Sequence, residues 1–346
     1  MINFCTLFDS NYLSRGLALY HSLQKVSSFH LYVVAFDDKC YNYLENASLP
    51  DLTVISLKEF EDEALLKIKD GRTTAEYCWT CTSSVILFCL KKYDLPACTY
   101  IDADMLFYSD PQVLLDEMGS NSILICKHGY TKDYDVSSTH GIYCVEFVCF
   151  KNTEDGLNAL IWWREKCLEW CYARLEDGKF GDQKYLDDWP VRFSSVRILE
   201  HPGGGVAPWN VQQFEFTRNE DKIFLKRKGE QMNYPVVFFH FHGLKFYTNR
   251  FVSFCGAIYE LNRAVNEIFY FPYVKILLQI EKDLSAKVVS FNVSGARINT
   301  PNKRKVFVEF LKDFGSMVLK GKASPFKPRN YNFKMHYHFY PLDQFK

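Results

Sequence analysis

The sequence predicts an α/β protein: a mostly parallel sheet flanked by helices, with a helical, basic C-terminal extension. Short apolar runs rich in strand formers alternate with segments of helical periodicity from the start of the chain. The length of 346 residues suits one large domain with an extension. Hydrophobic residues make up 48% and charged residues 24% of the chain, which excludes disordered and collagen-like proteins.

Predicted strands and helices alternate in the first half of the chain. Apolar runs predict strands at residues 2–8, 29–36, 52–57 and 97–101. Helices are predicted at 11–25, where Leu13, Leu17, Tyr20 and Leu23 have helical spacing, and at 82–93, before Pro96. Because strands and helices alternate, we expect parallel pairing, with polar residues after each strand collected at one edge of the sheet.

The second half continues the pattern and then changes. Thr153 is a plausible cap for a helix that runs through Leu160 and Trp163, and 203–205 is a tight glycine loop. A strand at 236–241 ends in His240-Phe-His242-Gly243. Beyond it the pattern is helical and then basic, so we divide the chain into a domain at 1–249 and an extension at 250–346.

The charge is balanced overall but not along the chain. Lys and Arg total 41, as do Asp and Glu, which argues against a nucleic-acid-binding protein. Residues 301–346 hold ten basic and three acidic side chains, a net charge of +7. This tail fits contact with an anionic membrane surface or an acidic partner, and the alternative, which base rates favour, is a solvated basic face.

The cysteines and the apolar segments indicate the compartment. The twelve cysteines lie largely in apolar runs and show no disulfide framework, and Cys78-Trp-Thr-Cys81 lacks the second pair of a zinc site. The chain begins directly with a strand-like run, and the longest apolar stretch, 268–280, is too short to span a bilayer. We therefore expect a cytoplasmic protein with reduced thiols, and contact of the basic tail with the inner face of the membrane is one of its two alternatives.

Two acidic residues at the end of an apolar strand form the candidate metal site. Asp102 and Asp104 follow the strand at 97–101, and residues i and i+2 of extended backbone project to the same side. Two carboxylates without a basic neighbour form a site for a hard divalent cation, whose remaining ligands would include phosphate oxygens. An imidazole from His240 or His242 would complete the set and favour Mn²⁺ over Mg²⁺, and Lys245 could neutralise a phosphate.

Four stretches resemble the nucleotide-sugar glycosyltransferases of GT-A type, most closely the family 8 pattern of glycogenin-like and lipopolysaccharide galactosyltransferase-like enzymes. They are Asp9-Ser-Asn11-Tyr12, Tyr100-Ile-Asp102-Ala-Asp104 after Leu95-Pro96, Gly181-Asp182-Gln183, and His240-Phe-His242-Gly243. The Lys-Pro-Trp that usually follows the last stretch is absent. The resemblance covers about the first 245 residues.

The resemblance implies a Rossmann-like GT-A fold and a set of roles. Asp182 and Gln183 would be catalytic residues at the transferred sugar, and Asp102, Asp104 and His240 would bind Mn²⁺ or Mg²⁺, with His242 as the alternative. The nucleotide would contact Thr6, Phe8, Asp9, Asn11, Tyr12, Asp102 and Lys245. The donor would be a UDP-sugar, the acceptor a glycan or lipid-linked glycan of a surface polysaccharide, and the anomeric configuration would be retained. The family's donor-contacting arginine has only Arg72 as a nearby candidate.

Two other functions remain open on the sequence alone. A nucleotidyltransferase acting on sugar phosphates would release pyrophosphate, but it favours a glycine-rich, basic loop after the first strand, which residues 9–23 lack. A non-catalytic sugar-nucleotide-binding module would bind without turnover. The glycine loop at 203–205 lies either near the active site or in a surface turn, and Trp209 either stacks on a sugar or packs in the core.

Overall fold

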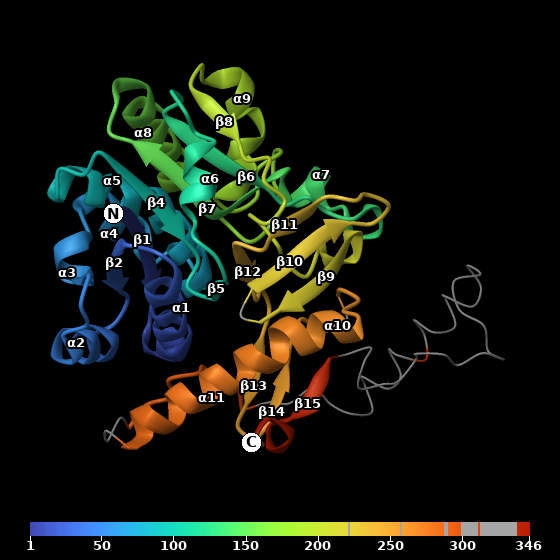
Figure 1. The fold of residues 1–346 in the computed structure, drawn as a ribbon. Coiled ribbons are helices and arrows are strands. Elements are labelled where there is room, and N and C mark those ends of the chain that lie inside the picture. Colours follow the sequence, from blue (N-terminus) through green and yellow to red (C-terminus); the bar gives the residue numbers. More distant parts are fainter. Residues whose placement is uncertain (221, 257, 287–289, 299–310, 312–337) are drawn as a thin grey trace.

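A seven-stranded sheet forms the centre of the protein (Figure 1). The computed structural model describes residues 1–346 except 221, 257, 287–289, 299–310 and 312–337. The strand order is β3-β2-β1-β4-β7-β6-β8, and four of the six pairings are parallel, which confirms the predicted mostly parallel sheet. The strands are β1 (Ile2–Phe8), β2 (Phe29–Ala35), β3 (Leu52–Ser56), β4 (Ala97–Ile101), β6 (Ile123–Lys127), β7 (Tyr143–Lys151) and β8 (Val196–Ile198).

Strand β7 departs from the parallel pattern, because it runs antiparallel to both of its neighbours, β4 and β6. The connection from β6 to β7 contains only short helical turns, including α7 (Ser137–His140), and no long helix that covers a face of the sheet. The reversal places the beginning of β7 beside the end of β4, where the backbone N–H of Asp102 donates to the carbonyl of Glu146 at 3.3 Å.

Helices cover both faces of the sheet. On one face α1 and α2 pack against Phe4 and Leu31, and on the other α5 and α8 enclose Cys5 and Val34. Helix α5 begins before the predicted residue 82, because Thr73 and Glu76 form a capping box at its start. The helices in this part are α1 (Leu13–Val26), α2 (Asp38–Ala47), α3 (Leu57–Phe60), α4 (Glu63–Lys69), α5 (Thr74–Lys92), α6 (Gln112–Asp116), α8 (Glu154–Glu169) and α9 (Trp189–Arg192).

A second body of small sheets adjoins the first through α1 (Figure 1). Its aromatic core lies between these sheets and α11, which contacts α1 and confirms the predicted C-terminal helix. The elements are β5 (Met105–Phe107) with β12 (Phe238–His240); β9 (Phe214–Asn219), β10 (Lys222–Arg227) and β11 (Asn233–Pro235); β13 (Lys245–Tyr247), β14 (Phe251–Ser253) and β15 (Phe339–Pro341); and the helices α10 (Arg263–Val265) and α11 (Phe271–Ala286).

The sheet β13-β14-β15 was not predicted, and the hairpin of β13 and β14 spans the proposed boundary at residue 249. The boundary itself stays a prediction. Most of the basic tail at 301–346 lies outside the described residues. None of the described helices is both long and apolar enough to cross a membrane. The twelve cysteines are free thiols, and all but the half-buried Cys78 are buried.

Candidate metal centre

The two acids of the predicted site lie where β4 gives way to β5. Asp102 follows the last residue of β4, and Asp104 precedes the first residue of β5. The hydroxyl of Tyr100, a residue of β4, donates a hydrogen bond to Asp102 Oδ1 at 3.1 Å and so orients the Asp102 carboxylate. Both side chains keep some exposure, 26% for Asp102 and 14% for Asp104, so they line an opening rather than a closed core.

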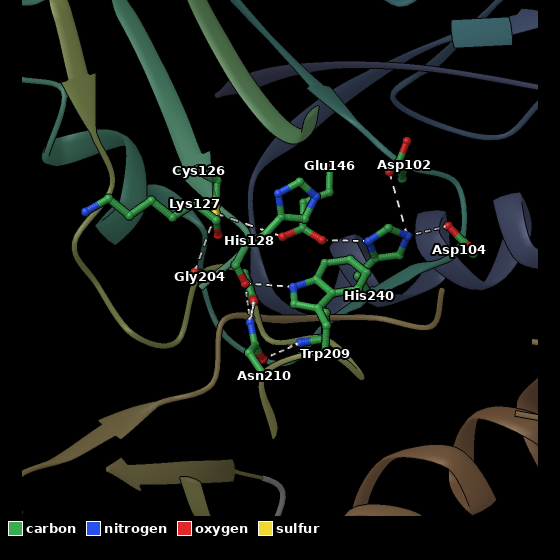
Figure 2. A network of polar contacts seen from close by, with 12 residues as sticks. Asp102, Asp104, Cys126, Lys127, His128, Glu146, Gly204, Trp209, Asn210 and His240 are labelled. Atoms are coloured by element: carbon green, nitrogen blue, oxygen red, sulfur yellow. Dashed lines mark hydrogen bonds and ion pairs between the residues drawn. The ribbon is translucent and has the colours of Figure 1, made fainter. Parts of the chain in front are cut away.

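Strand β12, which is distant in sequence, places His240 next to these two aspartates. It pairs antiparallel with β5, with His240 opposite Met105, and the N–H of Phe241 donates to the carbonyl of Asp104 at 2.9 Å. His240 Nε2 lies 3.1 Å from Asp104 Oδ1 and 3.7 Å from Asp102 Oδ2 (Figure 2). The register of β5 and β12 therefore produces the convergence of two acids and one imidazole that the sequence predicted.

Glu146 contacts His240 in the cluster, and the sequence analysis did not single it out. Its side chain is fully buried, and its Oε2 lies 2.6 Å from His240 Nδ1, on the side of the ring opposite to the aspartates (Figure 2). A carboxylate at one ring nitrogen fixes the orientation of the imidazole and directs the other nitrogen to a metal. A signal was present: Glu146 is the one charged residue within the apolar run 143–150, where an unpaired charge is costly.

The charges in this cluster are strongly coupled. Burial raises the pKa of Asp102 to about 6, and the neighbouring carboxylates add to the rise while His240 opposes it. Burial would also raise the pKa of Asp104, but the charge and hydrogen bond of His240 outweigh it and bring that pKa to about 2. Burial disfavours the imidazolium, yet Asp104 and Glu146 raise the pKa of His240 well above its usual value. Three carboxylates around one imidazole thus attract positive charge.

The donor set fits a divalent cation. One oxygen from each aspartate and one nitrogen of His240 lie within 4.8 Å of one another, so a single ion between them would reach all three. Two carboxylates and an imidazole suit Mn²⁺. Bound here, an ion would take the place of the proton on Nε2, and Glu146 would keep its hydrogen bond to Nδ1.

His242 does not join this set. Its ring centre lies 5.6 Å from that of His240, and the Trp209 indole makes T-shaped contacts with both rings. Trp209 is buried and donates from Nε1 to the His128 carbonyl at 2.7 Å, so it is a packing residue next to the site. The glycine loop also lies near the site: a side-chain carbon on Gly205, whose φ is +99°, would lie 3.4 Å from Glu146 Oε1.

Five of the predicted nucleotide-binding residues lie in or just after the end of β1, which is the neighbour of β4 in the sheet. Asp9 accepts hydrogen bonds from the backbone N–H groups of Asn11 and Tyr12, at 3.0 and 3.2 Å, and so shapes the turn that exposes both side chains. Thr6 and Phe8 are buried, with Phe8 in the core and Thr6 Oγ1 without a hydrogen-bond partner in the described part of the chain. Nucleotide contact by these five residues stays a prediction.

The predicted sugar-binding residues approach the cluster from the segment after α8. Asp182 is buried, and its Oδ2 has no hydrogen-bond partner among the described residues. Burial raises the pKa of Asp182 to about 7, and the charge of Asp102 adds to the rise. An unpaired buried carboxyl oxygen of this kind is available to a ligand hydroxyl. Gln183 Nε2 donates to the His140 carbonyl at 2.7 Å.

Arg72 and Lys245, the two basic residues predicted to contact the donor, have different surroundings. Arg72 donates to the carbonyls of Cys167 and Leu168, at 2.7 and 2.8 Å, so its guanidinium joins the segment before α5 to the end of α8. Lys245 is the first residue of β13, and its side chain is exposed. Burial lowers the pKa of His242, and the nearby charge of Lys245 also lowers it.

Comparison with known proteins places the chain in a family. It is 28% identical over 280 residues to the uncharacterized protein YfnD of Bacillus subtilis (strain 168), covering 79% of this chain and 87% of YfnD. It is 30% identical over 251 residues to the uncharacterized protein YfnF of the same organism, covering 70% of this chain and 81% of YfnF. The chain belongs to the YfnF family. No protein-family model matches this YfnF-family chain.

Among solved structures, this member of the YfnF family is similar to the galactosyltransferase LgtC in complex with donor and acceptor sugar analogues. The TM-score is 0.49 and the sequence identity 13%, and the match covers 83% of this chain and 100% of LgtC.

Proposed function

We propose that the protein is a metal-dependent glycosyltransferase that moves a sugar from a UDP-sugar to a glycan or lipid-linked acceptor. The observation that carries this proposal is the convergence of Asp102, Asp104 and His240 at the edge of the sheet where the motif around Asp9 also lies. The sequence resemblance to family 8 glycosyltransferases, carried by these same residues, supports the choice of donor.

The arrangement suits the cleavage of a sugar–phosphate bond. A divalent ion held by Asp102, Asp104 and His240 would stabilise the charge that develops on the departing diphosphate. Asp182 would accept a hydrogen bond from a sugar hydroxyl through its unpaired Oδ2, and Gln183 would lie near the anomeric carbon. Positive charge at that carbon resembles an oxocarbenium ion, which polar oxygens stabilise. We propose retention of configuration, as in the family that the sequence resembles.

The proposal is tested by product analysis. Purified protein is incubated with Mn²⁺ and a panel of UDP-sugars, and the nucleotide product is identified by chromatography. We expect UDP to accumulate, faster when glycan acceptors are added, and chelation of the metal to stop it. Release of pyrophosphate from a nucleoside triphosphate and a sugar phosphate would instead identify a nucleotidyltransferase. Tight UDP binding without turnover of any donor would identify a binding module and contradict the proposal.

A further inference from the structure

Three cysteines converge in the core on one side of the central sheet. Cys5 lies in β1, Cys98 in the neighbouring β4, and Cys89 near the end of α5. The register pairs Cys5 with Tyr100, and residues two apart in a strand project to the same face, so Cys5 and Cys98 share the face that α5 covers. No two of the three sulfur atoms are more than 4.8 Å apart. Three separate elements thus bring their thiols to one point.

The cluster is closed, and its surroundings are apolar. None of the three cysteine side chains has any exposed surface. They belong to a core that also holds Leu7, Val85 and Ile86. No other histidine, cysteine, aspartate or glutamate of the described residues joins this group. A set of sulfur donors without an oxygen ligand selects a soft ion, such as Cu⁺ or Zn²⁺, over Mn²⁺ or Mg²⁺.

The triangle of sulfur atoms has a size that suits a metal–thiolate site. An ion at the centre of a triangle with sides of 4.8 Å would lie about 2.8 Å from each corner, whereas a zinc–sulfur bond is about 2.3 Å long. Since 4.8 Å is the upper limit of the separations, each sulfur atom has to move inward by at most about 0.5 Å. Small rotations about the Cα–Cβ bonds provide a movement of this size.

The charge of the cluster favours a monovalent ion. Burial would raise the pKa of Cys89, but hydrogen bonds from the thiols of Cys5 and Cys98 outweigh it and bring that pKa to about 6. Burial raises the pKa of Cys5 and of Cys98 well above the ordinary value, so both thiols keep their protons. An ion of charge +1 would neutralise the single thiolate, whereas Zn²⁺ would need a second thiolate to be neutral in this apolar core. Zinc also prefers four ligands, and the cluster offers three.

We propose that Cys5, Cys89 and Cys98 bind one cuprous ion, which joins β1, β4 and α5. The Cys89 thiolate supplies the charge and the other two sulfur atoms supply lone pairs, so no electron is transferred. Strand β1 leads to Asp9 and β4 leads to Asp102, in each case four residues after the cysteine. The ion is therefore structural: it holds together the two strands that precede the predicted nucleotide-binding and metal-binding residues. This inference does not depend on the proposed function.

The test measures the metal content of the whole chain. The protein is produced in copper-supplemented cells, purified under anaerobic, reducing conditions and dialysed against EDTA, which removes ions from the candidate metal centre. Plasma mass spectrometry counts the metals that remain, and copper K-edge X-ray absorption identifies the atoms bonded to the copper. We expect about one copper ion per chain, with sulfur atoms as its neighbours.

Variants locate the ion. Cys89→Ala and Cys98→Ala should each hold at least about tenfold less copper, because even the loss of a group that only orients a ligand weakens metal binding about tenfold. Cys149→Ala is the matched control, since Cys149 is also buried in the central sheet, on β7, but packs in the core on the opposite face. Cys78→Ala is a second control, because Cys78 is the half-buried thiol of the chain. Both controls should keep the copper content of the wild-type chain.

Three results would overturn the inference. A wild-type chain without copper would show that the three thiols only pack together. Zinc in place of copper, bonded to sulfur, would contradict the assignment of a monovalent ion. Loss of copper from Cys78→Ala, with Cys89→Ala unaffected, would show that the accessible thiol captures the metal. The wild-type metal content and absorption spectrum do not depend on whether a variant folds, and none of these measurements involves UDP.

Discussion

Replacement of Asp104 by Asn should lower the rate of UDP release at least about 100-fold at saturating donor and Mn²⁺. Asn has the same shape but no charge, and Asp104 is the closer of the two aspartates to His240 Nε2, at 3.1 Å. Stabilisation of a leaving diphosphate by a bound ion contributes several kcal/mol, and each 1.36 kcal/mol corresponds to a factor of ten in rate. Initial rates of UDP formation, measured over a range of Mn²⁺ concentrations, check the expectation.

The control for this variant is Asp94→Asn. Asp94 lies at the opposite end of β4 with an exposed side chain and a positive φ of 49°, a conformation that Asn accepts readily. It should keep wild-type activity and melting temperature. If Asp104→Asn kept more than half of the wild-type rate, the carboxylate would have no part in binding the ion.

Replacement of Glu146 by Gln should weaken Mn²⁺ binding about 10- to 100-fold, the usual cost of losing a group that orients a metal-binding histidine. Glu146 contacts His240 Nδ1 at 2.6 Å and is separated from the aspartates by the ring, so it acts through the imidazole as a positioning residue. We therefore expect activity to recover when Mn²⁺ is raised, with little change in kcat. The measurement is a Mn²⁺ titration followed by electron paramagnetic resonance.

The matched control is Glu165→Gln, at an exposed position on α8 where no ion pair forms with the described residues. Its Mn²⁺ affinity should equal that of the wild-type chain. An unchanged Mn²⁺ affinity in a folded Glu146→Gln variant would contradict the positioning role. Loss of activity that no Mn²⁺ concentration restores would do so as well, because it would indicate a general disturbance of the buried core.

The parts of the site predicted from the sequence depend on local patterns. Strand β4 and the acids that follow it were predicted because an apolar run and two carboxylates in extended backbone are visible within eight residues, 97–104. Likewise β1 and its following turn were predicted, because parallel strands collect their carboxyl ends at one edge. In both places the residues that determine the local structure lie within a short stretch of sequence.

The parts that were missed depend on pairing between distant segments. Glu146 contacts His240 only because β7 runs antiparallel beside β4 and because His240, 94 residues later in the sequence, packs against it. His240 was preferred to His242 from the resemblance, but its position beside the aspartates depends on the register of β12 against β5, which no local pattern encodes. The strands β13, β14 and β15 have three residues each, too few for periodicity to indicate them.

The central claim is that Asp102, Asp104 and His240 hold one divalent cation. Crystals grown with Mn²⁺ and UDP allow the most direct test, because anomalous scattering from manganese locates the ion independently of activity. We predict one strong anomalous peak, bonded to carboxylate oxygens of Asp102 and Asp104 and to His240 Nε2, with diphosphate oxygens completing its coordination. A manganese peak elsewhere in the molecule, with UDP bound and these three side chains without an ion, would contradict the claim.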